Sequence, residues 1–293
     1  MDQNVGSRDV DVADVVQGAL IAIRFLYPTQ APERSEPFGP FVLPVAKGAP
    51  VGGNNLPLVL VSHGSGGTPW THRDLAAHLA RSGFVVALLQ HPGNHRGDDS
   101  LSGTAINLQN RPRHVRLTID AAFADPVLGA RLSRDTVAII GHSMGGYTGL
   151  AVAGGNPACP PWETADGRAG PLAVEHDPRV AALVLLAPAT SWFMADGALK
   201  DVRVPILMRT GGEDTLTDRS HADVVEQGLS DRRQLDHQMI PGAGHFAFLS
   251  SYPDQVKSAS IPPSQDPEGF DRLAFLPVLF RDIVGFLRRN LRP

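Results

Sequence analysis

Cysteine is nearly absent from this chain of 293 residues, which contains only Cys159. A single thiol excludes an intrachain disulfide framework and a cysteine-rich zinc site. The surrounding sequence, Ala158-Cys159-Pro160-Pro161, is typical of a loop, and no base adjoins the thiol. We therefore expect Cys159 to have no catalytic role.

Long apolar runs and an excess of basic residues are also missing. No stretch reaches the roughly 18 apolar residues that a membrane-spanning helix requires. Residues Met1 to Asp14 are acidic and polar and lack the basic and apolar regions of a signal peptide. The net charge of −4 argues against a nucleic-acid partner, which favours a basic face. These features predict a cytoplasmic protein without a membrane segment.

Two groups of polar residues are candidates for ligand binding. The densest basic cluster in mid-chain consists of Arg111, Arg113 and Arg116, and we favour a solvated helix face over an anion site. The second group consists of His91, His95, Asp98 and Asp99. These residues could bind a metal, but they show no tight ligand spacing, so we favour a solvated loop. The sequence therefore predicts no metal and no cofactor.

Short apolar segments alternate with segments of helical spacing along the chain. We expect strands at residues 18–27, 41–45, 58–62, 84–89, 136–140, 180–187, 205–210 and 235–240, and helices at residues 71–82, 113–123, 147–153, 219–229 and 277–290. Such alternation is typical of an α/β fold with a mostly parallel central sheet and helices on both faces. The site of such a sheet lies beyond the carboxyl ends of its strands.

We expect one domain over residues 1–293. Its longer connections are rich in proline, glycine or polar residues and are expected to shape a substrate pocket. These excursions lie near residues 29–55, 156–178, 191–200 and 250–269.

The most informative segment is Gly141-His142-Ser143-Met144-Gly145-Gly146. It matches the pattern G-x-S-x-G and lies between a predicted strand and a predicted helix, which is the context that this pattern requires. A sharp turn there lifts the Ser143 hydroxyl off the sheet. Gly141 and Gly145 leave room where side chains would collide. We therefore predict Ser143 as a nucleophile.

A serine hydroxyl is a poor nucleophile near neutral pH and needs an adjacent base. His245 lies in a loop just past the last predicted strand, where its imidazole could reach Ser143. A carboxylate after the penultimate strand should orient that histidine. Asp214 is the first choice, with Glu213 and Asp218 as alternates, although Asp214 could instead cap the next helix. The order serine, acid, histidine is the one that this architecture imposes.

An acyl-transfer enzyme also needs donors for the developing oxyanion. The segment Ser62-His63-Gly64-Ser65-Gly66-Gly67 follows a predicted strand, where an oxyanion loop should lie. We predict the backbone N–H groups of Ser65 and Met144 as the donor pair, and we expect His63 to brace the loop. A phosphate-binding loop is disfavoured, because the glycine spacings of nucleotide sites are missing. Candidate walls of the substrate pocket are His91, Trp192, Phe193 and Phe246, with Trp70 and Met194 as further candidates, although each aromatic also suits plain core packing.

Together these residues resemble the α/β-hydrolase fold and, more narrowly, the predicted dienelactone-hydrolase-like proteins and the platelet-activating-factor acetylhydrolases. The resemblance covers most of the chain from about residue 15. It is carried by Leu26-Tyr27-Pro28, by residues 62–66, by residues 72–76 through 83–86, and by residues 141–146. It implies that Ser143 is the nucleophile, Asp214 the acid and His245 the base, and that Ser65 and Met144 donate the oxyanion-hole N–H groups. The dienelactone hydrolases proper use a cysteine where this chain has Ser143.

The sequence therefore predicts a serine hydrolase that cleaves carboxylic esters through an acyl-enzyme. Short or medium acyl groups are expected, since no long apolar lid is evident. An amidase or peptidase with the same three residues stays open. A non-catalytic binding module on the same scaffold also stays open, because a fold does not fix a function. The sequence makes no prediction of the oligomeric state.

Overall fold

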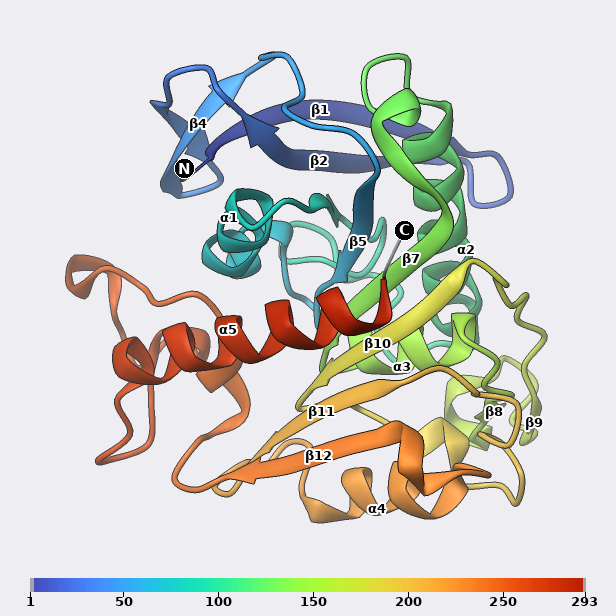
Figure 1. Cartoon of the computed structure of the whole chain (residues 1–293). Helices are drawn as coiled ribbons and strands as arrows, with labels where there is room; N and C mark the ends of the chain where they lie inside the picture. The colour runs from blue at the N-terminus through green and yellow to red at the C-terminus, as the bar shows by residue number, and fades with distance from the viewer. Residues whose placement is uncertain (1–2, 292–293) are drawn as a thin grey trace.

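The computed structural model describes residues 3–291, whose central feature is a ten-stranded sheet (Figure 1). The ends of the predicted 1–293 domain, residues 1–2 and 292–293, lie outside the described residues. The strands of this sheet are β1 (Asn4–Asp14), β2 (Ala19–Thr29), β3 (Arg34–Phe38), β4 (Phe41–Lys47), β5 (Leu56–Ser62), β6 (Val85–Leu89), β7 (Leu132–His142), β10 (Val180–Leu186), β11 (Ile206–Gly211) and β12 (Leu235–Ile240). The α-helices are α1 (Arg73–Arg81), α2 (Ala105–Ala124), α3 (Met144–Val152), α4 (Arg219–Gly228) and α5 (Arg272–Asn290).

The sheet is mostly parallel, as predicted. Its strand order is β12-β11-β10-β7-β5-β6-β2-β1-β4-β3, and the strands from β12 to β6 run parallel to one another. The β6–β2, β2–β1 and β4–β3 pairs are antiparallel. Figure 1 shows α5 crossing in front of the central strands. Helices α1 and α5 pack into the core of that face, and α2, α3 and α4 into the core of the other.

Strand β5 shows why the central strands are continuous apolar runs. Leu58 and Leu60 pack into the core beside α2 and α3, whereas Val59 and Val61 pack into the core beside α1 and α5. Successive side chains of a strand point to opposite faces, so a strand covered on both faces must be apolar at every position. The register of β5 with β7 pairs Ser62 with Gly141, which brings the ends of the two strands together.

The N-terminal region differs from the prediction. Residues 4–14, where no strand was predicted, form β1, which pairs with β2 from Asn4–Thr29 to Asp14–Ala19. The strand predicted at residues 18–27 continues through Pro28 to Thr29. Pro28 lies beyond the last β2–β6 pair, where a missing N–H is tolerated. The excursion at residues 29–55 contains two strands, β3 and β4, rather than one.

The helix predicted at residues 113–123 begins earlier, at Ala105, and contains Pro112. A proline inside a helix removes the hydrogen bond to the carbonyl four residues before it. That carbonyl belongs to Leu108, and the Tyr147 hydroxyl donates to it at 2.9 Å. The helix therefore continues through the proline because a side chain of α3 replaces the missing donor.

The remaining excursions contain little regular structure. Within residues 156–178, β8 (Ala158–Cys159) and β9 (Gly170–Pro171) form a separate two-stranded pair. In residues 191–200 and 250–269, the regular structure consists of short 3₁₀ helices. None of the helices among residues 3–291 is long and apolar enough to cross a membrane.

Candidate active site

Ser143 occupies a strained turn between β7 and α3. Its backbone has φ 54° and ψ −118°, a conformation that side-chain-bearing residues rarely adopt. The Ser143 N–H donates to the Leu186 carbonyl at 3.1 Å. Its own carbonyl accepts from the N–H groups of Gly146 at 2.8 Å and Ala189 at 2.9 Å. Backbone bonds from the end of β10 therefore hold the turn in place.

The glycines of the motif permit close backbone contacts. A methyl group on Gly145 would collide with the carbonyl of Ser62, and one on Gly141 would collide with the carbonyl of Gly145. A methyl group on Gly146 would lie 2.5 Å from the Pro188 Cβ atom. The turn thus fits against the end of β5 and the segment after β10 only because these side chains are missing.

The structure brings His245 and Asp214 together. His245 follows β12, and its Nδ1 atom lies 2.9 Å from Asp214 Oδ2, with both side chains buried. A carboxylate can only accept, so His245 carries its proton on Nδ1 and presents a lone pair on Nε2. Among the described residues, Ser143 Oγ makes no hydrogen bond with His245. Such bonds are often long without a bound substrate.

His142, the residue before Ser143, connects the serine turn with the His245 loop. Its Nε2 atom donates to the His245 carbonyl at 2.9 Å, and the two ring centroids lie 4.8 Å apart. Burial lowers the pKa of His142 well below its usual value, so this ring is neutral near pH 7. The contact places His245 beside the strand end that carries Ser143.

Asp214 is held by several donors. The N–H groups of Leu216 and Thr217 donate to Oδ1 at 2.9 Å, and the Thr217 hydroxyl donates to Oδ2 at 2.7 Å. Burial raises the pKa of Asp214, but hydrogen bonds from His245 and Thr217 outweigh it and leave the pKa below its usual value. The carboxylate is therefore ionised near pH 7. Thr217 was missed by sequence reasoning, although an aspartate followed three residues later by threonine signals a local side-chain turn.

The two alternate carboxylates are placed elsewhere. Glu213 is exposed, and within the described residues its side chain makes no hydrogen bond with His245. Asp218 is exposed and accepts from Ser220 N at 2.9 Å as the N-cap of α4. The capping role considered for Asp214 thus belongs to Asp218.

The loop after β5 passes close to the Ser143 turn. A Cβ atom on Gly64 would lie 3.2 Å from the Ser143 Cβ atom, so this loop runs directly beside the serine. Among the backbone hydrogen bonds that residues 3–291 make outside helices and strands, none has the N–H group of Ser65 or Met144 as its donor. Met144 is the first residue of α3, whose N–H has no partner within its helix. Both N–H groups are therefore available to a ligand.

The comparisons with known proteins agree with this architecture. A sequence model of the alpha/beta hydrolase fold matches residues 57–159, which include the loop after β5 and the Ser143 turn. This chain has the α/β-hydrolase fold. No curated protein matches the sequence significantly.

Solved structures with the same fold match over nearly the whole chain. A ferulic acid esterase from Streptomyces cinnamoneus has a TM-score of 0.67 and 19% identity, covering 100% of this chain and 92% of its own. A dienelactone hydrolase from Anabaena variabilis ATCC 29413 has a TM-score of 0.61 and 18% identity, covering 100% of both chains. The dienelactone hydrolase-like promiscuous phosphotriesterase P91 from metagenomic libraries has a TM-score of 0.63 and 16% identity, covering 97% of this chain and 99% of its own.

Within this α/β-hydrolase fold, the arginine cluster of α2 differs from the predicted solvated face. Arg111 is fully buried and bonds to Asn94 and to the carbonyl of His63. Arg113 pairs with the buried carboxylate of Asp14 at 2.8 Å, and Arg116 pairs with Glu175 nearer the surface. The prediction of a solvated face is therefore wrong for Arg111.

Two of the four predicted pocket residues are buried. His91 and Phe193 are 0% and 2% exposed. Phe193 nevertheless lines a cavity of about 310 Å³ together with Met194 and Val224. Trp192 is half-buried, donates to Glu163 at 2.8 Å, and lines a cavity of about 420 Å³ together with Cys159 and Met194. The half-buried Phe246 packs edge-on to the His245 ring at 5.1 Å between centroids.

Cys159 and His91 are both buried. Burial raises the pKa of the Cys159 thiol. Among residues 3–291, no group of three or more histidine, cysteine, aspartate or glutamate side chains has a geometry that could hold a metal. His91 instead belongs to a buried network of hydrogen bonds.

Proposed function

We propose that this protein is a serine hydrolase that cleaves small carboxylic esters. The observation that carries the proposal is the 2.9 Å bond between His245 Nδ1 and Asp214 Oδ2, next to a serine held in a strained strand-to-helix turn. The esterase and dienelactone hydrolase activities named for two structural neighbours support an ester substrate. We further infer that the chain forms one domain, since its central strands share one sheet.

In the proposed reaction, Ser143 Oγ attacks the ester carbonyl carbon while His245 Nε2 takes its proton. The carbonyl oxygen becomes an oxyanion, which the N–H groups of Ser65 and Met144 stabilise. The Asp214 carboxylate stabilises the imidazolium. The imidazolium then gives its proton to the departing alkoxide, and an acyl-enzyme is left on Ser143. Water, deprotonated by His245, attacks the acyl group, and the acid leaves as Ser143 regains its proton.

The test combines a chromogenic short-chain ester with a covalent probe. We expect the wild-type protein to hydrolyse p-nitrophenyl acetate or butyrate and to be labelled by a fluorophosphonate. Ser143→Ala should lose both properties and keep the wild-type circular dichroism spectrum. Asp214→Asn should keep the fold and lower kcat by roughly 10⁴-fold, because the histidine then adopts the wrong tautomer. Full turnover by Ser143→Ala would refute the proposal.

The same assay separates esters from amides. An esterase should cleave the ester much faster than the matched p-nitroanilide with the same acyl group. Comparable rates would assign an amidase activity instead. A wild-type protein that neither turns over substrate nor reacts with the fluorophosphonate would indicate a binding module on this scaffold.

A further inference from the structure

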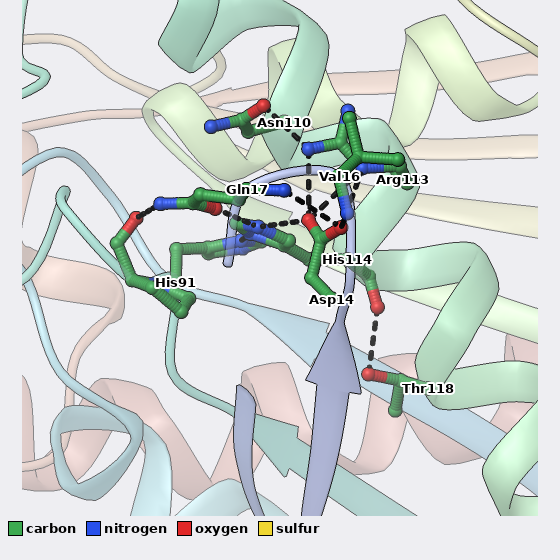
Figure 2. A network of polar contacts seen from close by, with 9 residues as sticks. Asp14, Val16, Gln17, His91, Asn110, Arg113, His114 and Thr118 are labelled. Atoms are coloured by element: carbon green, nitrogen blue, oxygen red, sulfur yellow. Dashed lines mark hydrogen bonds and ion pairs between the residues drawn. The ribbon is translucent and has the colours of Figure 1, made fainter. Parts of the chain in front are cut away.

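A continuous chain of buried polar side chains connects the end of β1 with the end of β5. Figure 2 shows its first part, in which Asp14, Gln17, His114 and His91 lie next to one another. His114 Nε2 lies 2.7 Å from Gln17 Oε1 and 3.4 Å from Asp14 Oδ2. His114 Nδ1 lies 3.1 Å from His91 Nδ1, and His91 Nε2 lies 2.9 Å from Ser62 Oγ. Asp14, His114, His91 and Ser62 are all 1% exposed or less.

The direction of each hydrogen bond in this row of side chains follows from the groups at its Asp14 end, which can only accept. Burial lowers the pKa of His114 to about 3 and that of His91 well below its usual value, so both rings are neutral near pH 7. The oxygens of Gln17 and Asp14 can only accept, so His114 carries its proton on Nε2. His114 Nδ1 must then accept from His91 Nδ1–H. His91 Nε2 accepts from the Ser62 hydroxyl, whose oxygen is left to accept from another donor.

That donor is Arg111, a fully buried residue of α2. Arg111 Nη2 donates to Ser62 Oγ at 3.2 Å and also to the carbonyl of His63. Nη1 donates to Asn94 Oδ1 at 2.6 Å. Within the described residues, no carboxylate forms an ion pair with Arg111. Burial lowers the pKa of Arg111 to about 9, which leaves it charged near pH 7. A buried cation surrounded by neutral acceptors costs stability, so a contribution to folding does not account for Arg111.

The guanidinium is linked to both segments that carry the proposed oxyanion hole, although among the described residues it donates no hydrogen bond to Ser65 or Met144. Its bond to the His63 carbonyl lies two residues before Ser65 in the loop after β5. Its Nε atom donates to Thr148 Oγ1 at 3.0 Å, and Thr148 in turn donates to the Met144 carbonyl at 3.0 Å. A planar fork with fixed donor directions can set the relative position of a loop and a helix, which a flexible ammonium cannot do equally well.

We propose that Arg111 is a positioning residue that holds the loop after β5 and the start of α3 at the spacing an oxyanion requires, and that the chain from Asp14 to Ser62 fixes its guanidinium. This inference rests on the proposed function. Arg111 touches no reacting atom, because it acts through the backbone of His63 and the side chain of Thr148. A displacement of about 1 Å between catalytic donors can lower a rate by about 10²-fold.

The first test replaces Arg111 by lysine. We expect Arg111→Lys to lower kcat for a p-nitrophenyl ester by about 10²-fold and to change KM by less than about threefold. Ser62→Ala, which removes the hydroxyl between His91 and Arg111, should lower kcat by about tenfold, the effect of one lost hydrogen bond. Arg116→Lys is the matched control on the same helix, since Arg116 pairs with Glu175 away from this chain, and it should behave as the wild type.

Two further readouts distinguish positioning from a structural role. A thionoester forms a thiolate-like intermediate that an oxyanion hole stabilises poorly. The ratio of ester to thionoester rates should therefore fall in Arg111→Lys. In Arg111→Ala, millimolar guanidinium ion should restore part of kcat by occupying the vacated site. If the variants had only lost folded protein, the ester-to-thionoester ratio would stay at the wild-type value and guanidinium would not restore kcat.

Amide hydrogen exchange of residues 62–67 supplies a measurement that does not depend on catalysis. We expect faster exchange in this segment of Arg111→Lys, with unchanged exchange in α5. If the segment loosens but the wild-type protein cleaves no ester, the anchoring stands and the proposed function fails. Unchanged exchange at residues 62–67, or a rate loss with an unchanged ester-to-thionoester ratio, would overturn the inference.

Discussion

His72 should make the stability of this protein depend on pH below neutrality. The residue ends a short 3₁₀ turn, Pro69–His72, and is 1% exposed. Within residues 3–291, neither of its ring nitrogens has a hydrogen-bond partner. Its ring lies 5.9 Å from that of His142. Burial lowers the pKa of His72 from 6.5 to about 4, because the charged ring would lose its hydration.

The sign follows from proton binding in the two states. Between pH 6.5 and about 4, the unfolded chain binds a proton at His72 that the folded protein does not bind. The free energy of unfolding therefore falls as the pH is lowered through this range. For a shift from 6.5 to about 4, the loss at pH 5 relative to pH 8 is about 2 kcal/mol. His72→Phe should remove this loss.

Urea unfolding of the wild type and His72→Phe at pH 8 and pH 5 measures the effect. The difference between the two pH values should be about 2 kcal/mol smaller in the variant. A packing cost of the larger ring cancels in this comparison, because it acts at both pH values. Leu273→Phe, which adds a ring at a position that is 69% exposed and removes no titratable group, is the control and should leave the difference unchanged. An identical pH dependence in His72→Phe and the wild type would refute the reasoning.

Two other substitutions test the packing and the charge of the site. Thr217→Val removes the hydroxyl that donates to Asp214, so the pKa of that carboxyl should rise. A pH–rate profile should show kcat/KM reduced by about tenfold, and more strongly at pH 5 than at pH 8. A profile of unchanged shape would contradict this reasoning. Gly145→Ala places a methyl group against the Ser62 carbonyl, so thermal unfolding should show a loss of about 1–3 kcal/mol and fluorophosphonate labelling should slow. Gly170→Ala, which meets no atom within 4 Å, should have neither effect, and equal behaviour of the two alanine variants would argue against the collision.

The central strands were predictable because they are buried on both faces. The predicted strand at residues 58–62 agrees with β5, since an apolar residue is required at every position of such a strand. β1 was not predicted, because one of its faces is largely exposed and its sequence is rich in aspartate. Its alternating Val10 and Val12, followed by a turn at Gly18, carried a weaker signal of a hairpin.

The proximity of Asp214 and His245 could be anticipated from topology alone. Each follows the carboxyl end of a parallel strand, as Ser143 does, and such ends gather at one edge of the sheet. Hydrogen-bond partners that lie on other elements could not be found in this way. In sequence, Arg111 could not be told apart from the half-buried Arg113 and Arg116, because arginine is rarely fully buried and helical spacing does not show which face meets the sheet.

The undetected strand and the misjudged arginine have a common physical cause. Asp14 ends β1, and its carboxylate accepts from Arg113 on α2, while His114 of the same helix lies 3.4 Å away. Burial raises the pKa of Asp14, but the hydrogen bonds from Arg113 and from the backbone of Gln17 and Val16 outweigh it. This part of α2 is therefore attached to the N-terminal hairpin through polar contacts, which hydrophobic periodicity does not reveal. Arg111 lies on the same helix and bonds to the His63 carbonyl, so polar contacts of α2 link the loop beside Ser143 to a strand two positions beyond β6 in the sheet.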